Sequence, residues 1–143
     1  VSARPGMNDI PADREPLDAV LETANVLSLH CPLTEQTRQL IDGAALARMR
    51  RDAILINTAR GALIDTAALA EALRTGAIAG AAIDVLPEEP PVHGDPLLDY
   101  DGDNLIVTPH IAWATREARQ DAIAELALNA RAFLNGKSRN RVA

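Results

Sequence analysis

Short apolar runs separated by amphipathic segments form the main pattern along this chain. Four such runs occupy residues 25–29, 53–57, 78–83 and 104–108. Apolar runs of four to six residues are typical of buried strands in a parallel sheet. Because helix-like segments separate the runs, the pattern predicts a doubly wound α/β sheet.

Local signals mark the boundaries of the helices between and beyond these runs. Asp42 and Asp65 are predicted N-caps, because a carboxylate at that position accepts a hydrogen bond from a free helix amide. Gly76 and Gly136 are predicted to end helices, because glycine adopts the left-handed conformation at low cost. The predicted helices are a short one beginning near Pro16 and three more over residues 43–49, 66–75 and 115–135, while residues 1–15 and 86–103 are predicted loops.

Polar residues follow each apolar run. In an open α/β sheet the ligand site lies outside the carboxyl ends of the strands. We therefore expect Arg60, Glu89 and His110 to converge on one edge of the sheet as a catalytic constellation. The planar guanidinium of Arg60 suits bidentate binding of a carboxylate, but its position fits a plain surface arginine equally well.

The other polar residues at the strand ends have two interpretations each. His110, held by Pro109 at a strand end, suits a general acid, whereas most single histidines are structural or exposed. Glu89 would orient and charge the imidazole if it contacts His110, whereas acidic pairs in loops are usually just solvated. Asp84 ends a Gly- and Ala-rich strand, where it suits either accepting from an amide or capping the following turn.

Structural explanations are favoured for the remaining candidates. No base is spaced to activate Cys31 as a nucleophile, so we interpret it as a buried small hydrophobe. The three histidines are far apart and no metal-ligand spacing exists, so we expect no metal site. Four acidic residues are interpreted as a solvated helix face: Asp13, Glu15, Asp18 and Glu22.

Composition and charge restrict the class of protein. The 143 residues amount to about one domain, and with one Trp, one Tyr and one Phe the core must consist of Ala, Leu, Ile and Val. The net charge of −6 argues against nucleic acid or an anionic membrane as a main partner. One cysteine excludes an internal disulfide and fits a reducing compartment. No apolar stretch approaches ~18 residues and no signal peptide is visible, so we expect a soluble, cytoplasmic protein.

Four segments together resemble the D-isomer-specific 2-hydroxyacid dehydrogenase family. They are LHCPLTEQT, LINTARGALID, AAIDVLPEEPP and NLIVTPHIAWAT, and the likeness extends from Leu17 to Asn140. Trp113 and the segment EPPVHGDPLLD resemble the glycerate dehydrogenase (hydroxypyruvate reductase) branch. The resemblance implies a Rossmann-like parallel sheet flanked by helices, an NAD or NADP cofactor and a homodimer. It also implies a small 2-oxo or 2-hydroxy acid substrate such as hydroxypyruvate or glyoxylate.

The resemblance further implies a role for each matching residue. Arg60 would bind the carboxylate and carbonyl of a 2-oxo acid, and His110 would protonate the carbonyl oxygen as hydride arrives from the nicotinamide. Glu89 would pair with His110 and keep it charged, and Asp84 would hold the nicotinamide carboxamide. The residues implied to line the cofactor are His30, Cys31, Pro32, Thr58, Ala59, Arg60, Asp84, His110 and Ala112.

The chain departs from the family pattern at its beginning. The phosphate-binding GxGxxG and the acidic residue about 20 positions after it are absent, and we expect both upstream of Val1. Residues 1–143 would then be the C-terminal part of a dinucleotide-binding domain, truncated at the N-terminus, whose helix 115–135 packs toward a missing substrate domain. We expect this piece alone to bind dinucleotide weakly and to be inactive. Arg4 is a candidate for recognising a 2′-phosphate, or a loop residue beyond that site.

Two other functions stay open. A dinucleotide-sensing, non-enzymatic corepressor-like relative has the same fold and can keep Arg60, Glu89 and His110. A stand-alone dimerisation or scaffold module is the third alternative. Reduction of hydroxypyruvate or glyoxylate distinguishes the dehydrogenase from the corepressor-like relative. Sedimentation tests the dimerisation or scaffold module. The preferred 2-oxo acid also stays open, because most substrate contacts are expected upstream.

Overall fold

The computed structural model describes residue 2 and residues 10–141 and forms two compact units. The first unit, Val1–His110, contains a sheet, and the second, Ile111–Ala143, contains one long helix. Residues 10–15 have no helix or strand, as predicted. The possible contribution of Arg4 lies outside the described residues.

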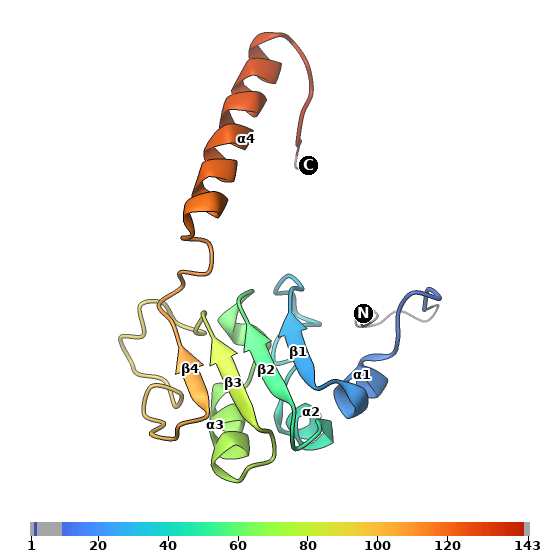
Figure 1. Ribbon diagram of the computed structural model, residues 1–143, viewed down its shortest axis with the longest axis vertical. Coiled ribbons are helices and arrows are strands. Elements are labelled where there is room, and N and C mark those ends of the chain that lie inside the picture. Colours follow the sequence, from blue (N-terminus) through green and yellow to red (C-terminus); the bar gives the residue numbers. More distant parts are fainter. Residues whose placement is uncertain (1, 3–9, 142–143) are drawn as a thin grey trace. The chain divides into compact units, whose positions relative to one another are not determined.

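A four-stranded parallel sheet forms the centre of the first unit (Figure 1). Its strands are hydrogen-bonded in chain order, and Leu27, Leu55, Ala81 and Leu105 lie side by side in the register. All four carboxyl ends therefore meet at one edge, as the sequence predicts. The strands are β1 (Val26–Leu29), β2 (Ile54–Asn57), β3 (Gly80–Ile83) and β4 (Leu105–Val107).

Capping residues begin and end the helices near the predicted positions. The Asp42 carboxylate accepts from the Ala45 amide at 2.9 Å, and Asp65 accepts from Ala68 at 3.0 Å. Gly76 has a φ of 66°, which confirms its left-handed position after the helix. The helical elements are α1 (Leu17–Thr23), α2 (Gly43–Arg48), the 3₁₀ turn η1 (Gly61–Leu63) and α3 (Thr66–Arg74).

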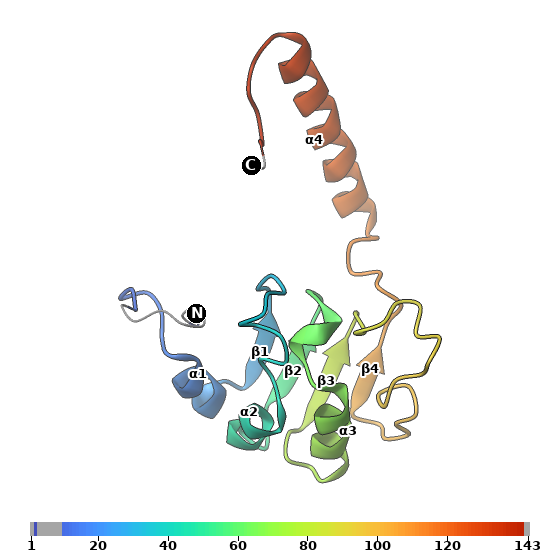
Figure 2. The same cartoon turned by 180° about the vertical axis from the view of Figure 1, so that it is seen from behind.

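The core of the first unit lies between the sheet and the two helices α2 and α3, which cover the same face (Figures 1 and 2). On the opposite face Val26, Ile54 and Ile106 are 56%, 42% and 64% exposed. The predicted parallel strands are therefore confirmed, but within the described chain they are buried on one face only. Successive residues of a strand point to opposite faces, and α2 and α3 cover one of these two faces.

The connection between β3 and β4 contains no helix or strand and is anchored by its own residues. Leu97 is buried in the core, and its amide donates to the Asp95 carboxylate at 2.9 Å. The peptide bond between Glu89 and Pro90 is cis. The predicted loop is thus confirmed, and its two ends are held close to the sheet.

The second unit is built on α4 (Arg116–Leu134). The Thr115 hydroxyl caps it by accepting from the Ala118 amide at 3.1 Å, and Gly136 follows it with a φ of 65°. The side chain of Arg139 folds back to both Glu125 oxygens at 2.8 Å. The helix carries exposed apolar side chains at Ile123, Leu126, Leu128, Phe133 and Leu134. In the part of the chain that the structure describes, no helix is long and apolar enough to cross a membrane.

Candidate functional site

The carboxyl ends of the four strands lie along one edge of the sheet (Figure 1), and a chemically active residue follows each of them. His30 follows β1, Arg60 follows β2, Asp84 follows β3 and His110 follows β4. The parallel order of the strands brings these positions to one edge of the sheet. Their joint catalytic role stays a prediction.

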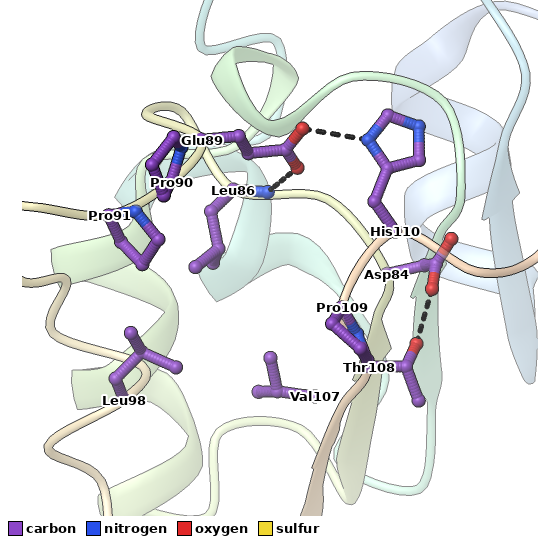
Figure 3. Close-up of a pocket in the computed structure, with 10 residues that line it drawn as sticks. All are labelled: Asp84, Leu86, Glu89, Pro90, Pro91, Leu98, Val107, Thr108, Pro109 and His110. Atoms are coloured by element: carbon purple, nitrogen blue, oxygen red, sulfur yellow. Dashed lines mark hydrogen bonds and ion pairs between the residues drawn. The ribbon is translucent and has the colours of Figure 1, made fainter.

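Glu89 and His110 form a hydrogen-bonded pair at this edge (Figure 3). Nδ1 of His110 lies 2.7 Å from Glu89 Oε2, and the Leu86 amide donates to Glu89 Oε1 at 2.9 Å. The two side chains are 45% and 37% exposed, so the pair is open to a ligand. His110 has a φ of 54°, and its amide donates to the Thr108 carbonyl at 3.0 Å. The backbone of His110 is thus held in a left-handed conformation.

The Glu89 carboxylate is held in its ionised form. Partial burial raises its pKa, but the hydrogen bonds from His110 and from the Leu86 amide outweigh that effect. A smaller opposing effect comes from the negative charge of Asp84, and the net pKa lies below the ordinary value of 4.5. An ionised carboxylate at Nδ1 accepts a hydrogen bond from the imidazole and so orients the ring. It also leaves Nε2 on the side of the ring that faces away from Glu89 (Figure 3).

Arg60 lies in a turn whose backbone is fixed by Asn57. Asn57 is 0% exposed, its Oδ1 accepts from the Ala59 amide at 3.0 Å, and its Nδ2 donates to the Arg60 carbonyl at 2.9 Å. The exposed Arg60 guanidinium donates to the Ala59 carbonyl at 2.6 Å. Within the described residues it has no hydrogen bond or ion pair to Glu89 or His110. The geometry therefore keeps a cation at the sheet edge and leaves open the choice between a ligand-binding and a plain surface arginine.

Asp84 is buried and connects the ends of three strands. The Thr108 hydroxyl, after β4, donates to Asp84 Oδ1, and the Asp84 amide donates to the Asn57 carbonyl at 2.9 Å. The carboxylate thus lies at the sheet edge beside His110 (Figure 3). Sequence reasoning missed Asn57 and Thr108 as organising residues. The signal available for both was a polar residue at the end of an apolar run.

A cavity of about 480 Å³ lies between the β3–β4 connection and the end of β4. Glu89 and His110 line it, and Figure 3 shows the apolar Leu98 and Val107 below this pair. Its other walls are mainly apolar. The lining residues are Asp84, Leu86, Glu89, Pro90, Pro91, Leu98, Val107, Thr108, Pro109 and His110.

A second cavity, of about 610 Å³, surrounds the end of β1 and includes His30, Cys31 and Pro32 in its lining. The buried Thr37 hydroxyl donates to the Pro32 carbonyl at 2.7 Å and thereby shapes the wall. The His30 ring contacts the Ser28 hydroxyl through Nε2 at 2.8 Å. Cys31, predicted to be a buried small hydrophobe, packs against the core but is only half-buried. The chain leaves the sheet at this point, which opens the thiol to the cavity.

Two further sequence predictions concern charged and metal-binding groups. The acidic face of α1 is exposed, and its Asp18 and Glu22 both form ion pairs with Arg48 at 2.8 and 2.7 Å. Asp13 and Glu15 are exposed too, but they precede α1, so the predicted helix face is wrong for these two residues. Over residue 2 and residues 10–141, no three His, Cys, Asp or Glu side chains are grouped to hold a metal ion. Ala112 belongs to the second unit, and its role stays a prediction.

Comparison with known proteins places this chain in a family. A family model described as "D-isomer specific 2-hydroxyacid dehydrogenase, NAD binding domain" matches residues 2–112. A glycerate dehydrogenase of Methylorubrum extorquens is 50% identical over 126 residues, which are 88% of this chain and 40% of that protein. A glyoxylate reductase of Thermofilum pendens is 47% identical over 121 residues, 85% of this chain and 35% of that protein.

Solved structures of this family also match the chain. The NAD-complexed D-isomer specific 2-hydroxyacid dehydrogenase from Lactobacillus delbrueckii ssp. bulgaricus superposes with a TM-score of 0.79 at 31% identity. The match covers 91% of this chain and 43% of that structure. The chain thus spans about two fifths of the length of the curated relatives that it matches.

Proposed function

Because the chain belongs to the D-isomer-specific 2-hydroxyacid dehydrogenase family, we propose that the intact protein transfers a hydride between NAD(H) and a small 2-oxo or 2-hydroxy acid. The observation that carries this proposal is the 2.7 Å contact between Glu89 and His110 at the carboxyl edge of the sheet. Reduction of a carbonyl needs an acid at its oxygen, and an imidazole ring held in place by a carboxylate can supply one.

His110 acts as the general acid in this proposal. With Nδ1 engaged by Glu89, Nε2 donates its proton to the carbonyl oxygen during reduction and accepts it during oxidation. Glu89 does not touch the substrate. Its negative charge stabilises the imidazolium before transfer and keeps the ring in one orientation.

Arg60 binds the carboxylate of the acid substrate. A guanidinium presents two parallel N–H donors that match a carboxylate, and the Arg60 side chain is exposed at the correct sheet edge. The fixed Asn57 turn keeps its backbone in place while the side chain reorients. The same cation stabilises negative charge that develops on the carbonyl oxygen.

The described residues fit a nicotinamide dinucleotide, which would supply the hydride when bound. The cavity at His30, Cys31 and Pro32 has room for part of it, and the buried Asp84 carboxylate offers an acceptor for the carboxamide. The turn Thr58-Ala59-Arg60 and Ala112 complete the proposed set. We propose NAD(H) as the cofactor, with NADP(H) as the alternative that the assay below distinguishes.

Three features of the wider protein belong to the same proposal. Residues 1–143 form the C-terminal part of a dinucleotide-binding domain, and the exposed apolar side chains of α4 pack toward a substrate domain of the intact protein. The free Cys31 thiol supports a reducing compartment such as the cytoplasm. A homodimer is proposed for the intact protein. Protection of α4 from hydrogen exchange in the intact protein, compared with the 143-residue chain, tests the packing of α4.

The test of function is oxidation of NADH and NADPH by the full-length protein with hydroxypyruvate, glyoxylate and pyruvate. We expect turnover with at least one acid, and a loss of about 10²- to 10⁴-fold in His110→Gln. The ratio of the two cofactor rates gives the preference. A wild type that binds dinucleotide but reduces none of the three acids would favour the non-enzymatic sensor instead.

A further inference from the structure

Gly61 lies in closer contact with a neighbouring loop than any side chain would permit. It begins η1, directly after Arg60, and it is buried. A Cβ placed on it would lie 2.0 Å from the Leu86 carbonyl carbon and 2.3 Å from the Pro87 nitrogen. Its φ lies outside the left-handed range, so the space and not the backbone conformation requires glycine here.

Leu86 is also the residue that supports the Glu89–His110 pair. Its amide donates to Glu89 Oε1 at 2.9 Å, while Glu89 Oε2 lies 2.7 Å from His110 Nδ1 (Figure 3). The carbonyl group of Leu86 therefore packs on Gly61, and its amide holds the Glu89 carboxylate. A shift of the Leu86 backbone must move the donor on which the Glu89 geometry depends.

The turn that carries Gly61 cannot yield in place of Leu86. The Arg60 carbonyl accepts from Asn57 Nδ2 at 2.9 Å and from the Leu63 amide at 3.2 Å. On the far side of η1, the Ile41 amide donates to the Leu63 carbonyl at 3.0 Å. Leu63 and Ile41 are both buried in the core. The connection after β3 is half-exposed at Leu86 and is held less firmly than this turn. A side chain at position 61 would therefore displace the Leu86 backbone.

We propose that Gly61 is a positioning residue that couples the Arg60 turn to the Glu89–His110 pair through its contact with the Leu86 backbone. It sets how closely the carboxylate-binding arginine and the proton-donating histidine approach. The proposal rests on the proposed function for the reaction that it serves. The contact between Gly61 and the Leu86 backbone rests only on the distances given above.

The direct test is Gly61→Ala, with Gly43→Ala as the matched control. A Cβ on Gly43 would meet its nearest neighbour, Ala68 Cβ, at an ordinary 3.8 Å. In the 143-residue chain we follow the Glu89 carboxyl carbon by NMR titration. We expect its pKa to rise toward the ordinary value in Gly61→Ala, because the Leu86 and His110 partners are lost, and to stay unchanged in Gly43→Ala. A folded Gly61→Ala with the wild-type titration overturns the proposal.

Kinetics of the full-length protein give an independent readout. A misplacement of about 1 Å costs about 100-fold in rate, so Gly61→Ala should lower kcat by that order while Gly43→Ala does not. The NMR titration needs no turnover. If the wild type proves inactive, the proposed function fails, yet the coupling is still measured. If the wild type is active and Gly61→Ala keeps its kcat, the coupling fails and the function stands.

A second variant covers the case in which Gly61→Ala does not fold. Glu89→Gln changes an exposed side chain at the other end of the same contact chain. We expect it to shift the NMR amide resonances of Leu86, Gly61 and Arg60. The control Glu88→Gln alters the neighbouring carboxylate, which instead contacts His93. If Glu89→Gln shifts the Gly61 and Arg60 resonances no more than Glu88→Gln does, no coupling exists and the proposal is overturned.

Discussion

Glu89 and His110 stand 21 positions apart in the chain, yet Glu89 Oε2 and His110 Nδ1 lie 2.7 Å from each other. The pair joins a loop residue after β3 to the residue that follows β4, and the Leu86 amide holds the other carboxylate oxygen at 2.9 Å. Since a carboxylate only accepts hydrogen bonds, the Nδ1 nitrogen must carry the proton. The contact therefore fixes both the orientation of the ring and which nitrogen faces a ligand.

Replacement of this carboxylate by an amide should slow the reduction. In Glu89→Gln the ring keeps a hydrogen-bond acceptor at Nδ1 but loses the charge-assisted hydrogen bond, which is roughly twice as strong as a neutral one. We expect kcat/KM of the full-length protein to fall about tenfold. Initial rates with NADH and hydroxypyruvate measure this loss, and Glu88→Gln should keep the wild-type rate. Equal rates for all three proteins would contradict the role given to Glu89.

The lowered Glu89 pKa predicts how folding stability depends on pH. A carboxyl group whose pKa is lower in the folded state stabilises that state above its unfolded value, 4.5 in ordinary surroundings. This contribution disappears as the pH falls through the lowered folded pKa. We therefore expect the difference in free energy of unfolding between wild type and Glu89→Gln to be constant near neutrality and to shrink below pH 4.5.

Urea unfolding of the 143-residue chain at a series of pH values from 7 to 3 measures that difference. Because the Glu89–His110 pair is exposed to solvent, this difference in free energy is small, so the two proteins should be compared in the same buffer and salt. A difference that grows on acidification would mean that burial, which raises the Glu89 pKa, dominates over its hydrogen bonds.

Substitution of Asn57 should lower the stability more than substitution of any other polar residue at the site. Its amide group is fully buried and satisfies both the Ala59 amide and the Arg60 carbonyl. Asn57→Ala leaves the Ala59 amide without this partner and the Arg60 carbonyl with the Leu63 amide alone, so we expect a loss of about 1–3 kcal/mol in the free energy of unfolding. We also expect a higher KM for the acid substrate, because the Arg60 turn loosens. The control Asn25→Ala removes an exposed amide with one 3.3 Å hydrogen bond to Asp52 and should cost less than about 0.5 kcal/mol. Equal losses in the two variants would show that the turn needs no support from Asn57.

Local features explain why the elements could be predicted from the sequence. Asp42 and Asp65 cap the helices that follow them through bonds to the third residue ahead, and Gly76 ends a helix by its own conformation. These effects depend on a few neighbouring residues. The convergence of Arg60 and His110 on one edge needed only the parallel order of the strands.

Contacts between distant backbone segments explain what the sequence did not predict. The packing of Gly61 on Leu86 depends on where a proline-containing loop returns to the sheet. The double role of Asn57 depends on the path of the turn after β2. The exposed face of the sheet could not be predicted either, because an apolar strand residue such as Ile54 has the same signature whether or not another element covers it.

Two adjacent residues of β2 test the one-sided core. Leu55 faces α2 and α3 and is fully buried, whereas Ile54 lies on the opposite face and is 42% exposed. In the 143-residue chain, Leu55→Ala should cost about 2–5 kcal/mol in the free energy of unfolding because it leaves a cavity. Ile54→Ala removes a side chain that is already partly in water and should cost less than about 1 kcal/mol. Urea unfolding of both variants measures the contrast, and equal costs would contradict a core on one face.

The same pair of variants distinguishes the 143-residue chain from the intact protein. Val26, Ile54 and Ile106 are exposed on three strands of one sheet face, and apolar patches of this kind usually mark a contact surface. We therefore expect the cost of Ile54→Ala to rise toward that of Leu55→Ala in the full-length protein, as the rest of the protein covers that face. Amide hydrogen exchange of the same variants shows whether β2 itself unfolds locally. A cost of Ile54→Ala that stays small at full length would mean that this sheet face remains in water in the intact protein, and its apolar residues would then need a partner outside the chain.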